Sequence, residues 1–158
     1  MTGWSARCAG PKKTTQRKHY SGKKKRHTRK ALVIVDGRRR IGCLSPGKRG
    51  ARHDKRLAGQ QHLVANIPPE VSILADSGFQ GMRHAGMCLP FKASKKHPLN
   101  EEQRQWNTLL AGVRVKAEHG IGGMKRYNAV AGVYRNRLPK TDERFNLLAA
   151  GLWNYFIS

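Results

Sequence analysis

The stretch ALVIVDG at residues 31–37 decides the fold. A short apolar run that is rich in β-branched residues and ends in a turn pair is typical of a buried strand. The Asp-Gly pair also predicts a hairpin, which leads into a second strand near residues 39–45. On this reading, Asp36 is most simply the turn residue of the hairpin.

Weaker patterns surround this hairpin. A helical pattern covers residues 54–65, and Asp54 is its expected N-cap, with a metal or DNA role for that residue as the alternative. Two further apolar runs predict strands, namely VSILA at 71–75 and GMCLP at 86–90. Residues 1–19 show no periodicity, so we predict an irregular basic segment there.

The last third of the chain predicts two long helices. The first begins at a capping box formed by Asn100 and Gln103, and the glycines of GIGG at 120–123 are expected to loosen or end it. The second follows Thr141. Each helix carries an apolar stripe that we interpret as core packing: Trp106, Leu109, Leu110, Val113, Ala117 and Ile121 on the first, and Phe145, Leu148, Ala149, Leu152, Trp153 and Phe156 on the second. The order of elements predicts a mixed α/β domain with a partly antiparallel sheet.

The charge of the chain indicates an anionic partner. Its 158 residues carry 32 Lys and Arg against nine Asp and Glu, a formal net charge of +23. A charge this high repels itself unless a polyanion neutralises it, so nucleic acid is the first partner to expect and an anionic membrane surface the second. No apolar run is long enough to span a bilayer. Three widely spaced cysteines, Cys8, Cys43 and Cys88, predict a reducing compartment and argue against both a disulfide framework and a zinc site. Together with the charge, they predict a cytoplasmic protein that works near DNA or RNA.

The positive charge is densest near the start of the chain. Eleven Lys and Arg precede the first acid, Asp36. We predict nucleic-acid contact by the residues Lys23, Lys24, Lys25, Arg26, Arg29 and Lys30. These contacts would be mainly to phosphates, which give affinity rather than sequence selection, and a solvated basic face is the alternative.

With so few acids, the position of each is informative. Asp76 ends an apolar run in LADSGFQG at 74–81. A carboxylate at a strand end beside a glycine turn is where α/β folds place ligands, although a turn-forming Asp that binds its own backbone is the alternative. Glu118 lies off the apolar stripe of the first long helix, and an ion pair with Arg114 one turn earlier is the simpler interpretation of its position alone.

Several motifs follow one another along nearly the whole chain: YSGKKKRHTRK at 20–30, ALVIVDG at 31–37, SPGKRGARHDKRL at 45–57 and LADSGFQG at 74–81. Further positions in the same order are Asn107, Arg114, Glu118, His119, Ile121, Gly122, Lys125, Tyr134, Arg135, Asn136 and Asn154. Together they resemble the bacterial insertion-sequence transposases of the DDE superfamily. The order of several motifs makes this resemblance far more specific than any one of them alone.

The resemblance implies a ribonuclease-H-like fold, in which helices flank a mixed sheet, and a three-carboxylate site for Mg²⁺ or Mn²⁺. Carried over by position, Asp76 is the second catalytic acid and Glu118 the third, and both are metal ligands. Arg114 and Lys125 of the same helix block would contact DNA. Two metal ions about 3.5–4 Å apart would activate the attacking oxygen and stabilise the leaving one during phosphodiester cleavage and joining.

The chain departs from the family at the position of the first catalytic acid. When Pro11 is matched to the family, the first Asp registers on Thr2, which has a hydroxyl but no carboxylate. The resemblance therefore predicts an N-terminally truncated transposase, with residues 1–19 as a remnant and 20–158 as a partial catalytic domain. It would bind DNA in the nucleoid without cutting it alone, and its protein partner would be an intact transposase or the product of an upstream reading frame. The alternatives are a non-catalytic DNA-binding remnant with a regulatory role and a basic RNA-binding structural protein.

Overall fold

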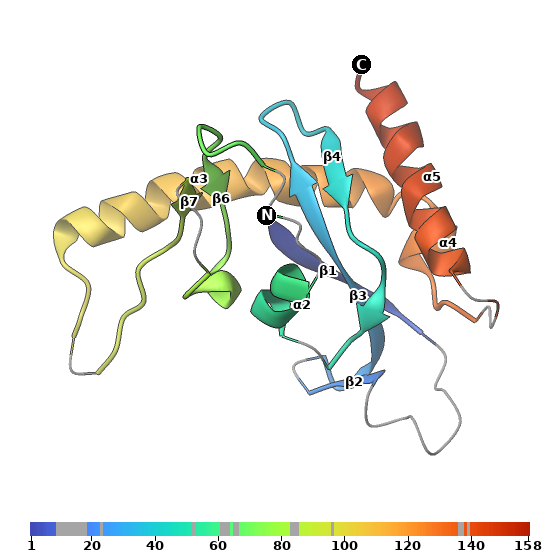
Figure 1. Ribbon diagram of the computed structural model, residues 1–158, viewed down its shortest axis with the longest axis horizontal. Helices are drawn as coiled ribbons and strands as arrows, with labels where there is room; N and C mark the ends of the chain where they lie inside the picture. Colours follow the sequence, from blue (N-terminus) through green and yellow to red (C-terminus); the bar gives the residue numbers. More distant parts are fainter. Residues whose placement is uncertain are drawn as a thin grey trace.

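The computed structural model describes residues 1–8, 19–22, 24–51, 53–60, 64, 67–82, 86–95, 97–135, 138 and 140–158. Their elements in chain order are β1 (Thr2–Arg7), β2 (Tyr20–Ser21), β3 (Arg26–Val35), β4 (Ile41–Leu44), β5 (Lys48–Arg49), α2 (Asp54–Gln60), β6 (Ile73–Leu74), η2 (Ser77–Phe79), β7 (Met87–Cys88), α3 (Glu101–Met124), α4 (Asn128–Ala131) and α5 (Thr141–Phe156). Figure 1 shows a long β3 at the centre and the long helix α3 running across the sheet. The predicted mixed α/β class is confirmed.

The main sheet is built around β3. On one side β1 pairs with β3 in antiparallel fashion, with Thr2 opposite Val33 and Arg7 opposite Thr28. On the other side lie β4, β5 and β2, which makes five strands in all. The predicted hairpin is confirmed, because β4 follows β3 directly and the Asp36 carboxylate accepts hydrogen bonds from the backbone N–H groups two and four residues on, each at 2.8 Å.

Residues 2–7 form a strand, so the prediction of an irregular segment over residues 1–19 is wrong for this part. Residues 9–18 lie outside the described part of the chain. The sequence TGWSAR contains one large apolar residue, Trp4, which leaves too weak a period-2 pattern to be recognised. The strand forms because β3 supplies a hydrogen-bonding partner along its whole length and Trp4 is buried beneath the helices.

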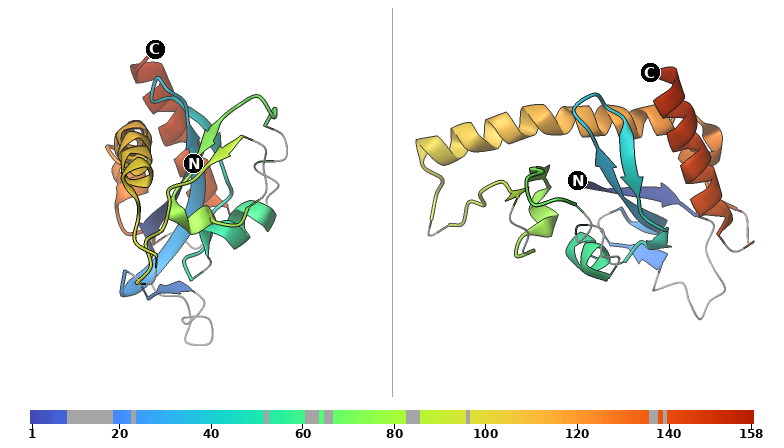
Figure 2. Two further views of the ribbon diagram at one scale, coloured as in Figure 1. Left: turned by 90° about the vertical axis from the view of Figure 1, so that its left-hand side faces the viewer. Right: turned by 45° about the horizontal axis from the view of Figure 1, so that its top comes forward.

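Two apolar cores lie on the two faces of the sheet. On one face Trp4, Ala31 and Val33 pack with residues of α3, α4 and α5. On the other face Met1 and Leu32 pack with α2, β6 and η2. Figure 2 shows α3 and α2 on opposite sides of β3. Since successive residues of a strand point to opposite faces, this arrangement fixes where each side chain of β1 and β3 points.

Helix α3 differs from its prediction at its C-terminal end. Its capping box is confirmed, since the Gln103 N–H donates to the Asn100 side chain at 2.8 Å and the Gln103 side chain accepts from the Asn100 N–H at 3.2 Å. The glycines at 120–123 neither end nor loosen the helix, which continues to Met124. A β-carbon on Gly123 would overlap the Trp153 ring, so glycine permits close packing of α3 against α5.

The interpretation of both apolar stripes as core packing is wrong for about half of their residues. The buried ones are Leu110 and Ile121 on α3 and Ala149 and Trp153 on α5. The exposed ones are Trp106, Leu109 and Val113 on α3 and Leu148, Leu152 and Phe156 on α5. Helix α3 is about 36 Å long at 1.5 Å per residue, and its N-terminal half runs beyond the sheet (Figure 1). Periodicity identifies an apolar face but not whether another element covers it.

The remaining predictions hold in part. The strands predicted at 71–75 and 86–90 are confirmed as β6 and β7, which form a parallel pair with Leu74 opposite Cys88. The predicted helix is confirmed over α2, and most of its expected continuation lies outside the described residues. Asp54 is the first residue of α2 rather than its N-cap, which is a correction. No helix within the described ranges is long and apolar enough to cross a membrane.

Candidate functional site

Asp76 lies where β6 ends and η2 begins. One carboxylate oxygen, Oδ1, accepts a hydrogen bond from the Ser77 backbone N–H at 2.7 Å, so the turn role considered for this residue is confirmed. The other oxygen, Oδ2, lies 3.5 Å from a guanidinium nitrogen of Arg114 on α3. The turn uses one oxygen to fix the carboxylate, and the second oxygen faces the helix.

Glu118 lies on α3 one helical turn after Arg114. The ion pair expected between these two residues does not form among the described side chains, because Arg114 pairs with Asp76 instead. Side chains four residues apart on a helix are neighbours, with about 5–6 Å between their β-carbons. Arg114 therefore connects the Asp76 carboxylate to the turn of α3 that carries Glu118.

A cleft of about 460 Å³ lies between the ends of β1, β3 and β6 and the middle of α3. Thr2, Arg114 and Glu118 line it together. The alternation of β1 puts Thr2 on the same face as Trp4, which is the face covered by α3. Thr2, which the resemblance predicts at the position of the first acid, thus borders the same space as Glu118, the predicted third acid.

The start of β1 is close to Asp76 and Arg114. The Met1 amino group donates a hydrogen bond to the Leu74 carbonyl, which joins β1 to β6. The pKa of this amino group is lowered to about 6, mainly by burial and also by Arg114, while Asp76 acts to raise it. The Met1–Leu74 bond, the Asp76–Arg114 ion pair and the cleft lining shared by Met1 and Arg114 place the start of β1, Asp76 and Arg114 close to one another.

Asp76 and Glu118 are the two acids that the sequence predicts as metal ligands. Among the described residues, no three or more His, Cys, Asp and Glu side chains group together in a way that could hold a metal ion. Mg²⁺ keeps several waters and is commonly bound through one or two carboxylates, so Asp76 and Glu118 would be a sufficient protein contribution for a single ion.

The two other acids near β1 and β3 have different surroundings. Asp54 forms an ion pair with Lys30 at 3.1 Å, and its carboxylate lies directly against Gly3. Gly3 alternates with Thr2, so Asp54 is on the α2 face of the sheet. Asp36 borders the cleft, but its Oδ1 closes the β3–β4 turn.

The basic residues predicted to contact nucleic acid fall into three groups. Lys24, Lys25 and Arg26 are exposed at the start of β3, and Lys125 is exposed at the end of α3, whereas Lys23 lies outside the described residues. Arg114 faces the cleft, as described above. Arg29 and Lys30 have acidic partners in Asp142 and Asp54.

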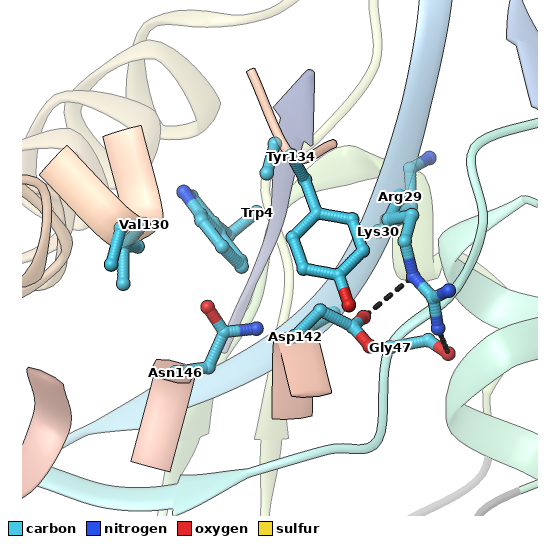
Figure 3. A pocket seen from close by; sticks show the side chains of 11 residues that line it. Trp4, Arg29, Lys30, Gly47, Val130, Tyr134, Asp142 and Asn146 are labelled. Carbon is cyan, nitrogen blue, oxygen red and sulfur yellow. Dashed lines mark hydrogen bonds and ion pairs between the residues drawn. The ribbon is translucent and has the colours of Figure 1, made fainter. Parts of the chain in front are cut away.

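The partner of Arg29, Asp142, was not singled out from the sequence. Its carboxylate lies 2.5 Å from the Arg29 guanidinium, which also donates to the Gly47 carbonyl at 3.2 Å (Figure 3). Figure 3 shows Trp4, Tyr134 and Asn146 around the same small space. Asp142 is buried at the first turn of α5. Acidic residues are common at helix N-termini because they interact favourably with the helix dipole, so the sequence gives no sign that Asp142 also contacts Arg29.

Known proteins resemble this chain over most of its length. The family described as DDE superfamily endonuclease matches residues 1–154. The chain belongs to this family. It is 36% identical over 148 residues to the "Probable transposase for insertion sequence element IS702" of Microchaete diplosiphon, a match that covers 92% of this chain and 52% of the relative. This DDE family chain therefore spans about half the length of the curated relative that it matches, and the predicted resemblance is confirmed. No solved structure matches it significantly.

Proposed function

We propose that this chain is the DNA- and metal-binding part of a DDE transposase, in which Asp76 and Glu118 bind one divalent metal ion for phosphodiester cleavage and joining. The observation that carries the proposal is the Arg114 contact, which ties the Asp76 carboxylate to the turn of α3 bearing Glu118 beside a shared cleft. The charge of +23 supports DNA as the partner, and by the same proposal the chain acts in the cytoplasm on nucleoid DNA.

The strand order supports a ribonuclease-H-like fold. The bond from Met1 to the Leu74 carbonyl extends the main sheet toward the β6–β7 pair. The main sheet and the β6–β7 pair are separate sheets, and side by side as this bond places them their order would be β4, β3, β1, β6 and β7, with an antiparallel part followed by a parallel part. Of the two proposed ligands, Asp76 then follows the end of β6, and Glu118 belongs to α3, the helix that covers the face of the sheet containing Trp4.

The roles of the chain's own groups follow from their positions. A bound Mg²⁺ or Mn²⁺ would supply Lewis-acid stabilisation of charge on a phosphate oxygen. Asp76 is held by the Ser77 N–H through one oxygen, and its other oxygen faces the Arg114 guanidinium. Arg114 balances the charge of Asp76, and its guanidinium is a donor for a DNA phosphate when a metal ion takes its place at the carboxylate.

Thr2 gives the proposal its second part, which is that this chain does not cut DNA alone. A threonine hydroxyl contributes no negative charge, so a second metal ion would lack its bridging ligand. An intact transposase or the product of an upstream reading frame could supply the missing acid. The same observation favours a second candidate function, a non-catalytic DNA-binding protein that regulates transposition.

A nicking assay on supercoiled plasmid tests this proposal. We expect the 158-residue chain to bind the plasmid and to produce no Mg²⁺- or Mn²⁺-dependent nicks, because removal of one member of a catalytic unit abolishes most of its effect. The control is the Glu118→Gln variant. Nicking by the unaltered chain that Glu118→Gln abolishes would contradict the proposal and place the first acid at Asp54 or Asp36.

A further inference from the structure

One end of the sheet carries cations that no acid neutralises. These residues, which we call the cationic edge, are Lys25, Arg26, Lys48 and Arg49. All four are exposed: Lys48 and Arg49 form β5, Arg26 begins β3, and Lys25 directly precedes it. All nine acids of the chain lie in the described part, and none forms an ion pair with a residue of the cationic edge there.

The register of β5 concentrates like charges. Arg49 lies directly opposite Arg29, and Lys48 directly opposite Lys30. Like charges at directly opposed positions of an antiparallel pair destabilise it. Asp142 and Asp54 compensate Arg29 and Lys30 from the two faces of the sheet (Figure 3 shows the first pair), which leaves the outer row of the cationic edge uncompensated. A folded chain that keeps such a row is complementary to a ligand of negative charge.

A nearby histidine reports the same electrostatic environment. Burial lowers the pKa of His19, and Arg49, Arg29 and His27 lower it further. A positive potential therefore extends from β5 to the residue that precedes β2.

We propose that the cationic edge binds the phosphates of a DNA duplex at a place separate from the cleft. This inference rests on the proposed function, and it adds a second contact surface to it. Thr2 at the cleft lies opposite Val33, whereas β5 pairs with residues 29–30 and Arg26 begins β3. At about 3.4 Å per residue along β3, the distance from the cleft is roughly 10 Å at Lys48, which lies opposite Lys30, and roughly 24 Å at Arg26.

The spacing matches duplex DNA. Phosphates along one DNA strand are about 3.4 Å apart along the axis, so a duplex aligned with β3 from the cleft meets the cationic edge roughly three to seven base pairs away. Lys48 and Arg49 are consecutive in a strand and so point to opposite faces, which lets them contact phosphates from both sides of the edge. The surface would fix the position of the duplex without reading its sequence.

The double variant Lys48→Gln/Arg49→Gln tests this proposal. Its affinity for a 16-base-pair duplex is measured by fluorescence anisotropy over a series of NaCl concentrations. For about six phosphate contacts, the unaltered chain should give a log–log salt slope of about −5. We expect the variant to lose about tenfold in affinity near 0.1 M NaCl and to have a slope smaller in magnitude by about 2.

The matched control is Lys92→Gln/Lys95→Gln, which removes the same charge from exposed residues preceding α3. An equal loss in the control would contradict the proposal, since binding would then depend on net charge alone. The same measurements on a duplex RNA of the same sequence give a further test. If the unaltered chain binds the RNA more tightly than the DNA, and the edge variant loses more affinity for the RNA than for the DNA, the surface binds RNA and the proposal is contradicted.

Two further readouts separate this proposal from others. The melting temperature of the edge variant without DNA should stay unchanged or rise by up to about 4 °C, because like-charge pairs are relieved. A fall in melting temperature would show a structural role and overturn the proposal.

Mn²⁺ binding by the variant should equal that of the unaltered chain. If the edge variant binds both DNA and Mn²⁺ as the unaltered chain does, the proposal about the cationic edge is wrong and the proposed function stands. If the unaltered chain binds no Mn²⁺, the proposed function is wrong.

Discussion

The substitution Thr2→Asp is expected to raise the Mn²⁺ affinity of this chain by about tenfold or more. The reason is that a third carboxylate would face the cleft that Glu118 and Arg114 already line. The affinity of hard cations rises with the number of anionic oxygen ligands, and residue 2 lies on the α3 face of β1. The affinity is measured by isothermal titration calorimetry and by the loss of the free Mn²⁺ signal in electron paramagnetic resonance.

The control for this substitution is Thr2→Asn, which has a similar shape but no charge. We expect it to bind Mn²⁺ as the unaltered chain does, and the gain from Thr2→Asp should disappear when Glu118→Gln is added. Metal-dependent nicking of plasmid should likewise appear only in the aspartate variant. If Thr2→Asp folds and leaves Mn²⁺ affinity unchanged, residue 2 does not belong to the site.

The second large effect is expected where α3 packs against α5. Gly123→Ala should lower the free energy of unfolding by about 1–3 kcal/mol, because the new methyl group would overlap the Trp153 ring. This ring is fixed in place, since its indole N–H donates to the Arg39 carbonyl at 2.9 Å. The neighbouring Asn154 side chain holds α5 to Ile41 through two hydrogen bonds of 2.8 and 2.9 Å to its backbone.

The adjacent glycine provides a matched control. Gly122 is exposed on the same helix, and a β-carbon there would meet no atom within 4 Å. Gly122→Ala should therefore raise the free energy of unfolding by about 0.5–1 kcal/mol, since alanine favours the helix. Urea denaturation followed by circular dichroism measures both changes. A shift in the same direction for the two variants would contradict the packing described here.

The same pair of variants tests how Glu118 is positioned. Gly123 lies five residues after Glu118 on α3, so displacement of this end of the helix moves the carboxylate relative to Asp76. Mn²⁺ affinity should fall in Gly123→Ala and stay unchanged in Gly122→Ala.

The elements with strong local signals could be predicted from the sequence. The β3–β4 hairpin was predictable because five apolar residues end in a turn whose Asp36 side chain closes it locally. The start of α3 was predictable because its capping box joins Asn100 to Gln103, only three residues apart. Strand β1 was not predictable, since it depends on pairing with β3 rather than on its own pattern. The exposure of Leu109 and Leu148 depends on which faces other elements cover, and periodicity carries no such information.

The same distinction applies to the site. Asp76 and Glu118 were predicted because each lies in a motif of recognisable sequence, whereas the Arg114 contact with Asp76 joins segments far apart in the chain. The pairing of Arg29 with Asp142 and the register of Arg49 on Arg29 are long-range in the same sense. Such contacts follow from the packing of α3, α5 and β5 around β3, and local sequence does not encode them.

The most direct test of the central claim is the position of a bound metal ion. Crystals of the chain grown with Mn²⁺ and measured near the manganese absorption edge would locate the ion by anomalous scattering. We expect one peak within ligand distance, about 2.1 Å, of a carboxylate oxygen of both Asp76 and Glu118. The Arg114 guanidinium should then have moved off Asp76. A peak bound to Asp54 instead, or one that touches only one of the two carboxylates, would contradict the site proposed here.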